Sequence, residues 1–241
     1  PRLPRRRPLT SAVVVMLLVA GGLAAALHGP ALLEQVPDRW NPWAPLAIDE
    51  PPGLLTRHKL ARLDADPAAC RAVLATAAVS WEPVPDRETG PGCGYAGAGR
   101  VSRTTAEVGA PFVLTCPAAV SLALWERHVL QPAAFAHFGE RVRRLEHYGS
   151  YACRNVYHRA AGPRSRHATA NAIDLAGFVL TDGRRIRVRT HWDTPAEAGA
   201  APPAVPPLAA EAAFLREIRD GACRWFDAVL GPDYNAAHAD H

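Results

Sequence analysis

Two short segments, far apart in the sequence, most constrain how this chain folds. The first, residues 165–174, reads SRHATANAID and places His167 seven positions before Asp174. The second, residues 238–241, reads HADH at the end of the sequence. An imidazole and a carboxylate from one segment, joined by an imidazole from a distant one, make a three-ligand zinc site that leaves a fourth position open for water. The sequence therefore predicts a fold that brings these two segments together around a site of the catalytic kind.

The pattern between and before these segments predicts a mixed α and β domain. Strands are expected at 101–114, 150–154, 170–178 and 185–190, and residues 142–148 suit a strand or the end of a helix. Helices are expected at 55–78, 116–138 and 211–230, with a break or kink at Pro132. Residues 194–207 are rich in Ala, Pro and Gly and are expected to form a surface loop. The predicted fold class is α+β, with a small antiparallel sheet that carries the metal site and is flanked by helices.

The N-terminal residues predict export. Four arginines at positions 2, 5, 6 and 7 precede an apolar run over residues 12–27. A basic segment followed by a short apolar one is typical of a secretory signal, and an uncleaved membrane anchor is the alternative. Both place the remaining chain in the periplasm or elsewhere outside the cytoplasm, and the anchor would hold it at the inner membrane. The predicted organisation is therefore a signal or anchor at 1–28, a linker rich in Pro and Trp at 29–54, and one domain at 55–241.

The charge of the chain argues against a nucleic-acid partner. The formal net charge is +4 at pH 7, and the four arginines of the leader account for it. No basic stripe remains in the rest of the sequence, as nucleic-acid binding would require.

The five cysteines fit an oxidising compartment. They contain no C-x-x-C pair, which excludes zinc-ribbon and thioredoxin-like motifs. In an exported chain, spaced cysteines most simply form disulfides. The predicted pairs are Cys153 with Cys223 and Cys70 with Cys93, although spacing alone does not fix the connectivity. Because the number is odd, at least one thiol stays free or pairs between chains.

Four stretches of the sequence resemble a known family. They are GSYACR at 149–154, residues 165–178, CRWF at 223–226 and LGPDYNAAH at 230–238. Together they resemble the bacterial extensin-like C-terminal domain, and the resemblance covers the chain from about residue 51 onward. That family is similar in motif to the D-Ala-D-Ala carboxypeptidase group of zinc peptidases, which act on bacterial cell walls.

The resemblance implies roles for particular residues. His167 and Asp174 would be two zinc ligands, and the third would be a histidine beyond the end of this sequence or one of His238 and His241. If it lies beyond the end, His241 matches the first histidine of an H-x-H pair and would stabilise the transition state. Arg154 matches an arginine that contacts the substrate, since its planar fork binds a carbonyl or carboxylate with two hydrogen bonds.

Two further residues follow from the chemistry of such a site. Asp240 is a candidate general base toward the attacking water, and Ser165 is a candidate to bond to a ligand or to the substrate. The sequence departs from the related motifs at two positions: Ala170 stands where the peptidases have glycine, and Arg166 where the extensin-like family usually has an acidic residue.

The sequence thus predicts a zinc metallopeptidase of the D-Ala-D-Ala carboxypeptidase or endopeptidase type. Its expected cofactor is zinc, and its expected partner is peptidoglycan or another cell-wall peptide, with membrane contact through the N-terminal segment. The alternative is a non-catalytic wall-binding or structural envelope module that keeps the peptidase fold.

Overall fold

The computed structural model describes residues 13–23, 36–193 and 209–241, in two units that comprise residues 1–44 and 45–241. In the first unit, residues 13–23 are helical and η1 (Asp38–Trp40) is a short 3-10 turn. Most of the predicted leader (1–12 and 24–28), the start of the predicted linker (29–35) and the predicted loop at 194–207 lie outside the described residues. Among the helices that are described, none has the length and apolar character needed to cross a membrane.

The second unit is built on a six-stranded sheet. Its order is β1-β4-β5-β6-β7-β8, and a separate hairpin pairs β2 with β3. Neighbouring strands are antiparallel except β5 and β6, which pair in parallel at Glu107 and Arg144. The sheet is therefore larger than the small antiparallel sheet expected from the sequence, and it is mixed. The strands are β1 (Ser80–Pro83), β2 (Arg87–Gly90), β3 (Cys93–Tyr95), β4 (Ala98–Arg103), β5 (Glu107–Thr115), β6 (Val142–Gly149), β7 (Asp174–Leu180) and β8 (Arg185–Arg187).

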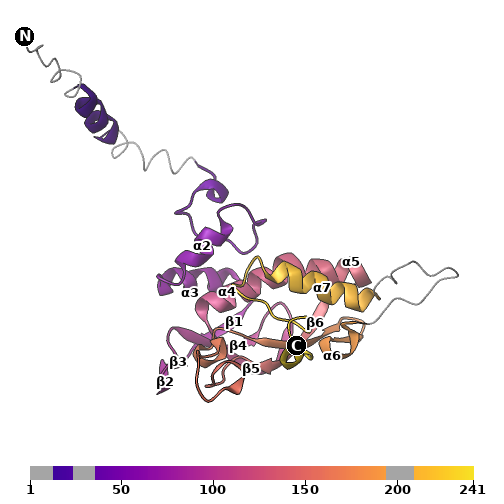
Figure 1. Ribbon diagram of the computed structural model, residues 1–241. Helices are drawn as coiled ribbons and strands as arrows, with labels where there is room; N and C mark the ends of the chain where they lie inside the picture. Colours follow the sequence, from indigo (N-terminus) through magenta and orange to yellow (C-terminus); the bar gives the residue numbers. More distant parts are fainter. Residues whose placement is uncertain (1–12, 24–35, 194–208) are drawn as a thin grey trace, which may run out of the picture. The chain divides into compact units, whose positions relative to one another are not determined.

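Helices flank this sheet, which confirms the mixed α+β class. Figure 1 shows α4, α5 and α7 lying along one side of the sheet. The helices are α2 (Thr56–Arg62), α3 (Pro67–Thr76), α4 (Cys116–Trp125), α5 (Gln131–Phe138), α6 (Val188–His191) and α7 (Ala210–Ala222). Short turns are η2 (Glu126–Leu130), which is a π-helical turn, and the 3-10 turns η3 (Val156–His158), η4 (Arg166–Thr169) and η5 (Ala236–His238).

The boundaries of the elements differ from the sequence-based expectation in several places. The strand expected at 185–190 stops at Arg187, immediately before helix α6 begins, and the strand expected at 170–178 begins at Asp174. The stretch expected at 101–114 is divided between β4 and β5.

The helix expected at 55–78 is two helices, because Asp66 caps α3 and Pro67 starts it. The helix expected at 116–138 does not break at Pro132. A π-helical turn, η2, lies just before it, and Pro132 stands in the first turn of α5, where its missing backbone N–H is tolerated. The helix expected at 211–230 ends at Ala222, and Trp225 is buried from the irregular segment that follows. Residues 150–154 form no strand.

A cluster of aromatic rings joins strand β7, which lies next to the edge strand β8, to the helices. Phe178 on β7 has its ring 5.7 Å from that of Phe214 on α7 and 6.3 Å from that of Trp125 on α4. All three side chains are buried, and the Trp125 indole donates to the carbonyl of Ile218 at 2.9 Å. The strand that begins at Asp174 is thus anchored to the helical layer a few residues later.

The disulfides are Cys70–Cys116 and Cys93–Cys153, and Cys223 is a free, exposed thiol. Both predicted pairs, Cys153–Cys223 and Cys70–Cys93, are therefore wrong. The fold explains both pairs. Cys70 on α3 meets Cys116 at the start of α4 because these two helices pack together. Cys93 on β3 meets Cys153 in the segment that follows β6. These contacts are set by topology, which the spacing of cysteines does not encode.

A carboxyl group is buried at the π-helical turn. The Glu126 side chain is fully buried; its Oε2 accepts hydrogen bonds from the backbone N–H of Thr105, at 3.1 Å, and from the Thr105 hydroxyl. Its other oxygen has no hydrogen-bond partner among the described residues. Burial raises the pKa of Glu126, against the lowering effect of hydrogen bonds from Thr104 and Thr105.

This raised pKa gives a prediction about stability and pH. A carboxyl whose pKa is higher in the folded state stabilises the fold fully below its unfolded pKa of about 4.3, and this stabilisation is lost as the pH rises toward the folded value. The unfolding free energy of wild type should therefore fall by about 1–3 kcal/mol relative to Glu126→Gln between pH 4 and pH 7. Urea denaturation of both proteins at several pH values measures this, and a pH-independent difference would contradict it.

Candidate functional site

Asp174 lies at the end of the sheet where β6 finishes and β7 begins. It is the first residue of β7 and pairs with Gly149, the last residue of β6. Its side chain is 22% exposed, so the carboxylate faces a partly open space at the strand end. The rigid strand fixes its position, as a functional group requires.

His167 is held toward this carboxylate by its own segment. It lies on η4, which Ser165 caps by accepting a hydrogen bond from the backbone N–H of His167 at 3.3 Å. The imidazole Nδ1 lies 3.1 Å from the carbonyl oxygen of Ser150, and Nε2 lies 3.0 Å from Oδ1 of Asp174. A ring that donates from Nδ1 to a carbonyl presents Nε2 to its other partner, which is the usual arrangement of a ligand histidine.

Ala170 adopts a backbone conformation that favours glycine. Its φ is +52° at the end of η4, and it is buried. Its carbonyl accepts a hydrogen bond from the backbone N–H of Thr115 on β5. Glycine adopts this left-handed conformation without steric cost, whereas alanine does so with modest strain.

The C-terminal segment brings a second imidazole to Asp174. His241 Nε2 lies 3.5 Å from Oδ1 of Asp174, and its Nδ1 lies 2.9 Å from Oδ1 of Asp240. The two segments expected to converge therefore do so at one carboxylate oxygen. Asp240 contacts His241 and so orients that ring.

His238 lies beside this group and makes its hydrogen bond elsewhere. Its Nδ1 lies 2.7 Å from Oδ1 of Asn235, and its ring centroid is 5.2 Å from that of His241. Burial, and the charges of His241 and Arg154, lower the pKa of His238 against the opposing effect of Asp174 and Asp240. A neutral His238 therefore adds no positive charge beside His241 at neutral pH.

The charges around Asp174 keep it ionised. Burial favours its neutral form, but the hydrogen bond from His167 and the charges of His167, His241 and Arg154 outweigh this effect and lower the pKa of Asp174. The carboxylate is thus a stable anion at the centre of three cationic or polar groups.

Arg154 lies near the site with its guanidinium free. Its charge acts on both Asp174 and His238, and its side chain is partly exposed. Within the described ranges it makes no hydrogen bond or ion pair to another side chain. Since Cys153 is tied to Cys93, the backbone that carries Arg154 is fixed while the guanidinium stays available.

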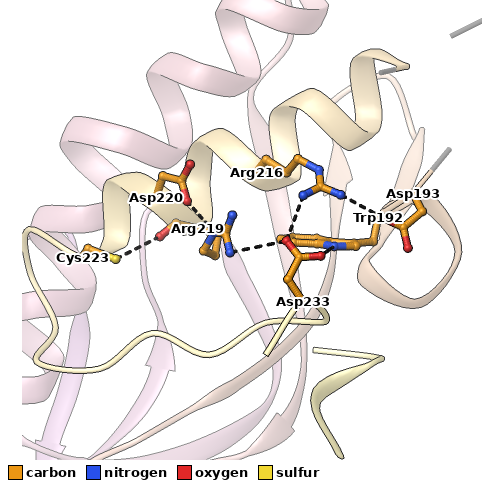
Figure 2. A network of polar contacts seen from close by, with 7 residues as sticks. All are labelled: Trp192, Asp193, Arg216, Arg219, Asp220, Cys223 and Asp233. Atoms are coloured by element: carbon orange, nitrogen blue, oxygen red, sulfur yellow. Dashed lines mark hydrogen bonds and ion pairs between the residues drawn. The ribbon is translucent and has the colours of Figure 1, made fainter. Parts of the chain in front are cut away.

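A polar network that the sequence analysis missed secures the C-terminal segment. Figure 2 shows Arg216 and Arg219 reaching from α7 toward Asp233. Asp233 accepts hydrogen bonds from the Trp192 indole at 2.8 Å and from Arg216 at 2.9 Å, and both guanidinium groups lie over the Trp192 ring at 4.7 and 5.2 Å. The hydrogen bond from Trp192 and the charges of Arg216 and Arg219 lower the pKa of Asp233. This anchor lies five residues before His238, and no local sequence signal marks it.

The expected metal centre stays a prediction. Across residues 13–23, 36–193 and 209–241, no group of three or more His, Cys, Asp or Glu side chains is arranged as a metal site. The geometry does define a class of molecule, namely an α+β domain with a His–Asp–His cluster where a strand end meets the C-terminal segment.

The comparisons with known proteins agree with the resemblance in the motifs. The family model described as "Extensin-like protein C-terminus" matches residues 68–241. The chain therefore belongs to the extensin-like C-terminal family. No curated protein and no solved structure matches it significantly.

Proposed function

We propose that this domain is a zinc-dependent peptidase that cleaves an amide bond in peptidoglycan peptides, outside the cytoplasm. The observation that carries the proposal is the position of Asp174 Oδ1, which lies 3.0 Å from Nε2 of His167 and 3.5 Å from Nε2 of His241. The two disulfides support an oxidising compartment, in line with the basic and apolar N-terminal residues.

The distances fit a shared metal ion. Two ligands bound to zinc at about 2.0–2.1 Å in tetrahedral geometry lie about 3.3 Å from each other. The two distances from Asp174 Oδ1 bracket this value. The donor set of imidazole and carboxylate also matches the ligands of catalytic zinc sites, which keep one position open.

In this proposal His167 and Asp174 hold the metal, and the third ligand is His241 or a histidine beyond residue 241. Zinc supplies a Lewis acid and an activated water to such a site. The carbonyl of Ser150 keeps His167 in the tautomer that a ligand needs.

The other residues bind the substrate and move a proton. Arg154 binds the terminal carboxylate or a carbonyl of the substrate peptide through two parallel hydrogen bonds. If the third ligand lies beyond residue 241, the Asp240–His241 pair next to Asp174 would accept the proton from the attacking water or stabilise the oxyanion that forms. If His241 is itself the third ligand, Asp240 would accept that proton. Ser165 acts on the backbone of His167 and so positions that ring rather than touching the substrate.

A second candidate function is a wall-binding module without catalysis. The cluster is satisfied without a metal, because Asp174 already pairs with two imidazoles. Arg154 and the exposed side chains around the site would then bind wall peptides or glycans.

The experiment that tests the proposal is digestion of purified peptidoglycan and of synthetic stem peptides, followed by mass spectrometry. It uses the protein with its natural C-terminus and the variants His167→Ala, Arg154→Ala and His58→Ala. His58 is exposed on α2 and serves as the matched control. We expect His167→Ala to lose at least a thousandfold in kcat/KM, Arg154→Ala to lose about tenfold to a hundredfold, and His58→Ala to match wild type. Stable binding of wall fragments by folded wild type without any turnover would refute the peptidase and favour the binding module.

A further inference from the structure

Exposed aromatic side chains gather at the terminal histidines. In the described part of residues 45–241, the large aromatic side chains that stand exposed are Phe135, Tyr148, Tyr157 and Tyr234. The three tyrosines all have rings in contact with His238 or His241, whereas Phe135 lies on α5. Exposed aromatic rings that cluster around a polar site are typical of ligand-binding surfaces.

These rings form a continuous row that three separate segments supply. The ring of Tyr148, on β6, lies 6.0 Å from that of His241, and His241 lies 5.2 Å from His238. His238 in turn lies 5.7 Å from Tyr234 and 6.3 Å from Tyr157. The row therefore runs from the end of β6, past the His–Asp–His cluster, to the loop at 155–164.

The loop holds Tyr157 in place against its backbone preference. Tyr157 and His158 both have a φ of +56°, a region that non-glycine residues rarely adopt and that is often retained at functional sites. The loop is closed by a β-bridge between Asn155 and Arg164. The Tyr157 hydroxyl accepts a hydrogen bond from Nδ2 of Asn235 at 3.0 Å. The ring is thus fixed before any ligand arrives, which lowers the entropic cost of binding.

We propose that Tyr148, Tyr157 and Tyr234 form a subsite that binds a sugar ring of the wall glycan next to the His–Asp–His cluster. A sugar ring has an apolar C–H face and a rim of hydroxyls, and a tyrosine matches it with a flat apolar ring and a polar hydroxyl. A hydrogen bond with Tyr157 raises the pKa of Tyr234. This inference rests on the proposed function in that it takes the bacterial wall as the substrate.

The test is binding of two probes by titration calorimetry. One is a β-1,4-linked tetramer of N-acetylglucosamine, which carries no peptide, and the other is diacetyl-L-lysyl-D-alanyl-D-alanine, which carries no sugar. Tyr157→Ala, Tyr234→Ala and Tyr148→Ala should each weaken binding of the tetramer by about fivefold to tenfold. Phe135→Ala is the control, since it removes an exposed aromatic ring elsewhere, and it should bind the tetramer as wild type does.

The outcomes separate this subsite from the proposed peptidase. Tetramer binding by wild type and by His167→Ala, together with no turnover of peptidoglycan or stem peptides by wild type, would overturn the catalytic proposal and keep the subsite. No binding of the tetramer by wild type, or a loss in the tyrosine variants confined to the peptide probe, would overturn the subsite and leave the peptidase standing. Replacing Tyr157 could also loosen the loop at 155–164, because its hydroxyl is bonded to Asn235. Tyr148 lies on β6, outside that loop. Weaker tetramer binding by Tyr148→Ala therefore reports the loss of a ring and not the unfolding of the loop.

Discussion

Replacing Cys93 and Cys153 together by serine should lower the free energy of unfolding by about 4 kcal/mol. The disulfide joins residues 60 positions apart. Without a crosslink of this span the unfolded chain gains conformational entropy, which stabilises the unfolded state by about 4 kcal/mol. The bond also ties β3 to the residue just before Arg154, so its removal should loosen the loop at 155–164 as well. Urea denaturation under non-reducing conditions measures the first effect, and hydrogen exchange of residues 150–165 measures the second.

Cys223→Ser is the control for this double variant. Because Cys223 is exposed and free, its replacement should change stability by less than about 0.5 kcal/mol. A double variant as stable as wild type, or a Cys223→Ser variant as unstable as the double variant, would show that the pairing described above does not stabilise the protein in solution.

Phe178→Ala should cost about 3–5 kcal/mol of unfolding free energy. The ring is 2% exposed and packs against Trp125 and Phe214, so its loss leaves a cavity between the sheet and the helices. Phe178 also lies on the strand that begins at Asp174, and the variant should therefore weaken the site together with the core. Thermal and urea unfolding provide the measurement.

Phe135→Ala is the matched control for the core variant. Phe135 is 64% exposed on α5, and its removal should change stability by less than about 0.5 kcal/mol. Equal losses in Phe135→Ala and Phe178→Ala would contradict the view that Phe178 is part of the core between β7 and the helices.

Much of the site was predictable because its residues lie in short, dense motifs. In the segment from Ser165 to Asp174, Ser165 caps a short turn, His167 lies on that turn and Asp174 begins a strand. Each of these features depends on residues close together in the sequence. The convergence with His241 was also predicted, because an imidazole and a carboxylate from one segment, joined by a distant imidazole, match the three-ligand pattern of a zinc site. The role of Ser165 as a cap of the turn follows the usual preference of serine for that position.

Other features depend on contacts that no local pattern encodes. The parallel pairing of β5 with β6 and the disulfide partners are set by topology. Trp192, Arg216 and Asp233 come from three distant segments, and although Asp233 lies in the 230–238 stretch, no local pattern indicates that it pairs with the other two. The tyrosine row was missed for the same reason, since single exposed tyrosines are common.

The most direct test of the central claim is the zinc content of the purified protein with its natural C-terminus. Plasma mass spectrometry after dialysis would compare wild type with His167→Ala, Asp174→Ala and the control His58→Ala, each checked for folding by circular dichroism. The account predicts close to one zinc per molecule in wild type and in His58→Ala, and little in the two site variants. Folded wild type that holds no more zinc than His167→Ala would contradict it.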